Sequence, residues 1–131
     1  IKGNGSSEYE QIGDVSYKLQ IYANDHDKGM IVCSQIPKSN ENDNRNSKGI
    51  DFTKLKAKGA GNIEEDAHVA IKMAEDYGEM GERYVMINLS KNKYGSLKCV
   101  TYKYEIDQRL NFSLVQRDPQ VVDKLKQEGK L

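Results

Sequence analysis

The sequence lacks a long apolar run and an excess of charge of one sign. No stretch approaches the roughly 20 apolar residues of a membrane-spanning helix, and no signal-peptide pattern opens the chain. We therefore expect a cytoplasmic protein with no membrane partner. Lys and Arg number 20 among 131 residues, and Asp and Glu also number 20. This balance excludes a uniformly basic nucleic-acid binder and an acidic solvating tail.

Residues that form metal sites and disulfides are also scarce. The two histidines, His26 and His68, have no Cys or His at ligand spacing, so no zinc site is expected. Cys33 and Cys99 each lie in an apolar, strand-like run, and the chain has no CxxC motif. The sequence therefore predicts two buried, free thiols in a reducing compartment.

The N-terminal part of the sequence predicts a helix followed by a buried strand. Ser7 and Glu10 have the spacing of a capping box, and apolar residues then recur at steps of three and four over residues 8–24. A short continuous apolar run follows at Met30–Cys33. Runs of this kind are typical of parallel strands that are covered on both faces.

A long polar loop follows over residues 37–61. Four asparagines lie within seven residues, and no large apolar side chain occurs over Ser39–Ser47. Such a stretch contributes nothing to a core, so we expect it to be mobile. A loop of this length within a small domain usually has a function.

The back of the chain predicts an antiparallel meander. A single helical turn is expected from Asn62, and strands are expected near residues 69–73, 83–89, 97–106 and 110–115. Asp118 followed by Pro119 predicts the start of a C-terminal helix that ends near Glu128. The fold class is α/β. Because the buried strand needs neighbours that the chain does not supply, we expect the back half of a larger α/β domain.

Although the net charge is zero, acidic and basic residues are grouped in separate blocks along the chain. Residues 62–82 hold seven acids against Lys72, and residues 83–109 hold six bases against two acids. Over residues 48–58, within the long loop, four lysines stand against Asp51: Lys48, Lys54, Lys56 and Lys58. These blocks are either ordinary solvated faces or a flexible basic loop that meets a polyanion.

Three short segments carry a further pattern. They are Cys33-Ser34-Gln35, Lys58–His68 and Ser90–Gly95. In this order and spacing, over about residues 7–114, they resemble the back half of the ATPase domain of DnaB-type replicative helicases. That resemblance implies a partial RecA-like P-loop NTPase core, comprising a helix, a buried parallel strand, a long loop, an antiparallel β-meander and a C-terminal helix. The helicase portion would cover residues 1–115, with a C-terminal helix or tail at 116–131.

The resemblance also implies roles for individual residues. Gln35 would sense the γ-phosphate at the end of the buried strand. Lys91 and Lys93 would reach across a subunit interface to the neighbour's ATP, although Lys93 stands where the family usually has Arg. Two solvated turn lysines remain the alternative. The loop lysines would contact the phosphates of single-stranded DNA: Lys48, Lys54, Lys56 and Lys58.

The acids of residues 64–66 are more simply explained as helix-start carboxylates than as a metal site, and His68 replaces the family's usual Asp. No G-x-x-x-x-G-K-[ST] motif occurs, so the chain has no P-loop to hold phosphates. We therefore expect this chain alone not to hydrolyse ATP and to carry no bound cofactor.

The resemblance implies an intact parent protein, encoded by a bacterium, phage or plasmid, that uses ATP and Mg²⁺ and translocates on single-stranded DNA. It also implies ring-like self-association, with a primase or a helicase loader as a further partner. Two alternatives stay open. One is a related RecA-like ATPase of recombination or clock type. The other is a non-catalytic DNA-binding or assembly module.

Overall fold

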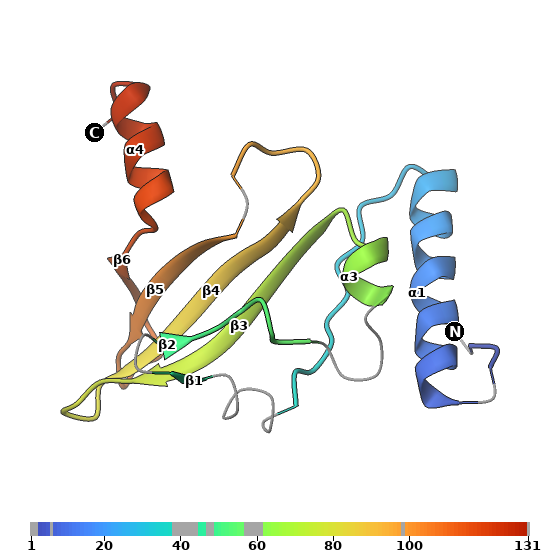
Figure 1. The fold of residues 1–131 in the computed structure, drawn as a ribbon, viewed down its shortest axis with the longest axis horizontal. Coiled ribbons are helices and arrows are strands. Elements are labelled where there is room, and N and C mark those ends of the chain that lie inside the picture. Colours follow the sequence, from blue (N-terminus) through green and yellow to red (C-terminus); the bar gives the residue numbers. More distant parts are fainter. Residues whose placement is uncertain are drawn as a thin grey trace.

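The computed structural model describes residues 3–5, 7–37, 45–46, 49–56, 62–97 and 99–130. Over these residues the fold is a mixture of helices and one antiparallel sheet of four strands in the order β3-β4-β5-β6 (Figure 1). The helices and strands are α1 (Glu8–Asp25), β1 (Arg45–Asn46), β2 (Gly49–Ile50), α3 (Asn62–Asp66), β3 (Val69–Tyr77), β4 (Arg83–Asn92), β5 (Val100–Ile106), β6 (Phe112–Gln116) and α4 (Pro119–Gln127). None of the helices in this part of the chain is long and apolar enough to cross a membrane.

Helix α1 begins where the capping box predicts. The Glu10 amide donates to Ser7 Oγ over 3.2 Å, and the Ser7 amide donates to Glu10 Oε2, also over 3.2 Å. Two of the unpaired amides at the helix start are thereby satisfied. The helix packs against α3 rather than against the sheet, and none of its own residues is buried (Figure 1).

The predicted buried strand at Met30–Cys33 is wrong. These residues are extended but belong to no strand, and Ile31 is 96% exposed. A strand buried on both faces requires neighbouring strands, and the described residues pair only in antiparallel ladders elsewhere. The prediction of buried thiols is also wrong, because Cys33 and Cys99 are both exposed, although both are free.

The meander of β3 to β6 is confirmed, but β3 presents its faces in an unexpected way. The alternation of apolar and other residues correctly predicts a strand. Its buried side carries Lys72 and Ala74, whereas Ile71 and Met73 are 61% and 54% exposed. Lys72 and Ala74 lie on the side of the sheet that meets Phe52, Leu55 and Glu64, whereas Ile71 and Met73 lie on the opposite side.

That covering segment comes from the predicted loop. Phe52 and Leu55 pack on Ala74 of β3 to form the core cluster, and Ile36, Ile50 and Met86 pack around them. Leu55 is fully buried. The description of residues 37–61 as a structureless loop is therefore wrong for β1 and β2, which pair with each other, and for residues 50–55, which supply the centre of the core.

The C-terminal helix is confirmed and is attached to the sheet through its cap. The Asp118 side chain accepts from the Gln120 amide at the helix start and from the Thr101 amide of β5, each over 3.0 Å. Val121 of α4 is buried. The predicted tail at 116–131 thus continues from β6 and is held by β5.

We expect Leu55→Ala to lower the free energy of unfolding by about 2–5 kcal/mol, because it leaves a cavity at the centre of the core. Leu110→Ala is the matched control, since Leu110 is 67% exposed and its truncation should cost less than about 0.5 kcal/mol. Urea unfolding followed by circular dichroism measures both. Equal losses in the two variants would show that residues 49–56 are not the core.

Candidate functional site

The turn between β4 and β5 is shaped by one asparagine. Asn92 Oδ1 accepts from the Gly95 amide over 3.0 Å, and Asn92 Nδ2 donates to the Leu97 carbonyl over 3.3 Å. A Cβ atom at Gly95 would lie 1.9 Å from Asn92 Nδ2, so a larger residue there would displace this side chain. Lys91, at the end of β4, and Lys93, in the turn, therefore lie in an ordered part of the structure.

The half-buried side chain of Lys91 is held by hydrogen bonds within the chain. Its Nζ donates to the carbonyl oxygens of Glu64 and Glu65 over 2.8 and 2.7 Å. Both carbonyls belong to α3, whose last turn contains no basic residue of its own. Carbonyls near the end of a helix are left without helical partners, and a cation beside them is favourable. The Lys91 ammonium therefore closes α3 and attaches it to the hairpin.

Lys93 differs from Lys91 in its surroundings. Its backbone amide donates to the His68 carbonyl over 2.9 Å, but its side chain is exposed. The Lys93 Nζ lies 5.7 Å from the centre of the Tyr94 ring, and that ring meets the His68 ring edge-on at 5.3 Å between centroids. Within the described chain this ammonium makes no ion pair, so it is available to an anion.

These contacts join two segments that lie far apart in the sequence. The segment that contains α3 and His68 precedes β3, whereas Lys91–Gly95 spans the end of β4 and the turn that follows it. Both segments belong to the pattern that suggested a helicase, and the structure brings them together through the carbonyls of Glu64, Glu65 and His68. Spacing along the sequence did not predict these contacts.

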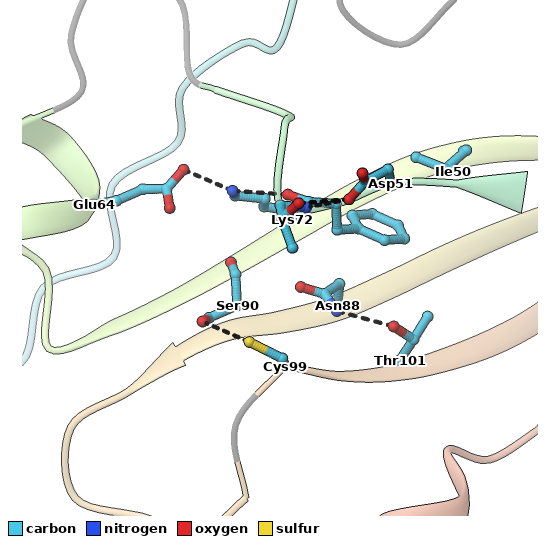
Figure 2. Close-up of a pocket in the computed structure, with 10 residues that line it drawn as sticks. Ile50, Asp51, Glu64, Lys72, Asn88, Ser90, Cys99 and Thr101 are labelled. Atoms are coloured by element: carbon cyan, nitrogen blue, oxygen red, sulfur yellow. Dashed lines mark hydrogen bonds and ion pairs between the residues drawn. The ribbon is translucent and has the colours of Figure 1, made fainter. Parts of the chain in front are cut away.

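A pocket of about 370 Å³ lies beside these contacts, between the sheet and residues 50–53 (Figure 2). On one wall Lys72 Nζ is 2.9 Å from Glu64 Oε1 and donates to the Phe52 carbonyl over 3.0 Å. On the other wall Asn88 Nδ2 donates to Thr101 Oγ1 over 2.9 Å. The ammonium is nearly buried and has two partners, so the loss of either would leave a buried charge poorly paired.

Sequence reasoning did not identify Lys72. One signal was present, since Lys72 is the single base within the acidic block of residues 62–82. A lone cation of this kind at an alternating strand position is a candidate for a buried ion pair. The helix-start acids of residues 64–66 are thus in part structural, because Glu64 is the partner of Lys72.

Two of the four predicted DNA-contacting lysines can be located. Lys54 and Lys56 are both exposed, and Lys54 Nζ lies 3.4 Å from Asp51 Oδ2. Lys48 and Lys58 lie outside the described residues. The hydroxyl of Thr53 donates to Asp51 Oδ1 over 2.6 Å and, with Lys54, lowers the pKa of the Asp51 carboxyl below its usual value.

Gln35 follows the exposed run that was expected to be a buried strand. Its side chain is exposed and makes no hydrogen bond to another described residue. Its proposed role as a γ-phosphate sensor stays a prediction. No group of three His, Cys, Asp or Glu residues in the described ranges is arranged to hold a metal ion.

Comparison of the chain with protein-family models, with curated proteins and with solved structures found no match in any of the three.

Substitutions of Lys91 and Lys93 should have different effects on the free energy of unfolding. We expect Lys91→Met to lower the free energy of unfolding by about 1–3 kcal/mol, because two carbonyls of α3 lose a charged donor. Lys93→Met is the matched control and should change this free energy by less than about 0.5 kcal/mol. Thermal unfolding of the two variants beside the parent tests this. A loss in Lys93→Met as large as that in Lys91→Met would contradict the assignment.

The Asp51 carboxyl provides a test by pH. We expect Thr53→Val to raise the pKa of Asp51 toward its usual value, because the largest cause of its depression is removed. The pKa of Asp14, which is lowered chiefly by its hydrogen bond with Lys18, should not move. An NMR titration of the side-chain carboxyls measures both.

The sign of the stability effect follows from the lowered pKa. The contribution of Asp51 is fully present above the carboxyl pKa of the unfolded chain and disappears as pH falls through the lower folded value. Thr53→Val should therefore reduce the acid dependence of unfolding. An Asp51 pKa that is the same with and without the Thr53 hydroxyl would overturn this account.

Proposed function

We propose that the chain is the back half of a RecA-like ATPase domain of the DnaB helicase type, which assembles with neighbours and moves along single-stranded DNA by ATP hydrolysis with Mg²⁺. The observation that carries this proposal is the joint between the α3 segment and the Lys91–Gly95 turn. Two segments chosen from the sequence for their resemblance to one family are in contact in the fold.

Lys91 and Lys93 would have different roles in the contact with the neighbour's ATP. Lys91 fixes the turn to α3, and Lys93 presents an exposed ammonium beyond it. A positive charge supplied to a neighbour's terminal phosphates stabilises the charge that develops during phosphoryl transfer. Because lysine is a point charge rather than a two-pronged fork, Lys93 would bind one phosphate oxygen at a time.

The DNA contact would come from the basic segment of residues 48–58. Exposed lysines on a loop attract a phosphate backbone without reading its sequence. Lys54 and Lys56 support this assignment because both are exposed. Phe52 is the one aromatic residue of the segment and is buried in the core, so it is not available to stack on bases.

We expect the chain to bind a fluorescent single-stranded oligonucleotide with an affinity that falls steeply with salt. If four lysines each neutralise one phosphate, the affinity should fall about 50-fold between 50 and 200 mM salt. The variant with Lys48, Lys54, Lys56 and Lys58 all changed to Gln should lose most of this binding. Fluorescence anisotropy at the two salt concentrations measures it.

The matched control changes four lysines elsewhere to Gln, and so alters the net charge equally: Lys28, Lys124, Lys126 and Lys130. This control should bind as the parent does. If both variants bind equally weakly, the attraction is a general effect of charge, and the assignment of the loop fails. If the parent chain does not bind at low salt, the proposal of a DNA-translocating protein loses its support.

A further inference from the structure

The side of the sheet opposite Phe52 is apolar and open. We call it the open sheet face. Cross-strand pairing places its side chains together, because residues directly opposite each other point to the same side of a sheet. The pairs Met73 with Ile87, Ile87 with Tyr102, and Tyr104 with Leu114 connect all four strands.

This face is exposed at its two edge strands, whereas Val85 of β4 and Val100 of β5, which share the face, are only 7% and 1% exposed. Ile71 and Met73 of β3 are 61% and 54% exposed, and Phe112 and Leu114 of β6 are 56% and 40% exposed. Among the described elements, α1 has its main contacts with α3, and no helix packs extensively on the sheet. Exposed apolar side chains on both edge strands of one face are typical of a surface that a partner covers.

The charges on the open sheet face allow two copies of the chain to bind through the same face. The charged side chains that share its register, Glu75 and Arg83, lie at one end and form an ion pair. The face therefore carries no net charge, and the chain as a whole has a formal net charge of 0. Two copies can approach face to face without repulsion, which a surface of one sign would prevent.

The size of the face sets the strength of such a contact. Four strands about 4.8 Å apart and about six residues long cover roughly 400 Å² per copy in flat projection. Two copies together would therefore bury about 800 Å². This figure treats both faces as flat and leaves out the extra area of protruding side chains. This area is below the roughly 1,200 Å² of stable, specific interfaces and within the range of weak, transient ones, so the expected affinity is micromolar or weaker.

We propose that a second copy of this chain covers the open sheet face in a symmetric, face-to-face dimer. Sheets packed in this way stand about 10 Å apart, with aromatic and aliphatic side chains interleaved. A two-fold axis through the face lets each residue meet the same surface on its partner. The dimer depends on neither nucleotide nor DNA, so it stands or falls separately from the proposed helicase function.

Sedimentation equilibrium of the 131-residue chain at about 5 and 200 µM tests this proposal. We expect the mass to rise from near monomer to dimer over this range. Met73→Lys places a charge in the interface of both copies and should raise the dissociation constant about 100-fold. Met80→Lys is the matched control, because Met80 is 90% exposed in the β3–β4 turn and away from the face, and it should dimerise as the parent does.

Phe112→Lys on β6 is a second interface variant, and circular dichroism verifies that each variant is folded. A parent chain that stays monomeric at the higher concentration overturns the proposal. So does a dimer that survives both Met73→Lys and Phe112→Lys, or one that Met80→Lys weakens equally. Larger oligomers without a defined dimer also count against it.

Discussion

The described fold depends on how one ammonium is buried. Lys72 lies on the covered side of β3, where its charge meets the Glu64 carboxylate and the Phe52 carbonyl. These partners belong to two separate segments, so the side chain ties α3 and the core segment to the sheet. A buried cation is tolerated only when it is fully partnered. The chain therefore gains a defined arrangement of these segments, because any other arrangement would leave the charge without partners.

The same arrangement explains the geometry of the hairpin. Lys72 holds Glu64 by its side chain, while Lys91 holds Glu64 and Glu65 by their backbone carbonyls. Lys72 of β3 and Lys91 of β4 thus both bind α3, one through a side chain and the other through backbone carbonyls. A helix of five residues has little stability of its own. Its position, and that of the turn attached to it, follows from these tertiary contacts.

The elements governed by local rules were predicted from the sequence. The capping box at Ser7 predicted the start of α1, Asp118 and Pro119 predicted the start of α4, and alternation predicted β3. Each of these signals acts within one helical turn or one strand. The failures at Met30–Cys33 and at residues 49–56 concern which surfaces meet. An apolar run is a buried strand only if neighbours cover it, and composition does not reveal that Phe52 and Leu55 reach the sheet.

The candidate site divides in the same way. The turn and its lysines were found from sequence, since Gly95 and the flanking charges are local features. The anchoring of Lys91 was not, because its partners are backbone carbonyls 26 and 27 residues away, and any residue type supplies a carbonyl. The role of Lys72 was missed because its pairing with Glu64 depends on how α3 folds back over β3.

The attachment of α1 has a consequence for cooperativity. The helix buries none of its residues, and its described link to α3 includes one hydrogen bond, from Gln20 Nε2 to the Asp66 carbonyl over 2.8 Å. A segment with so little buried surface opens at a lower free energy than the sheet. We therefore expect helix α1 and the meander to be separate units of local unfolding, so that the helix opens while the sheet and its core remain folded.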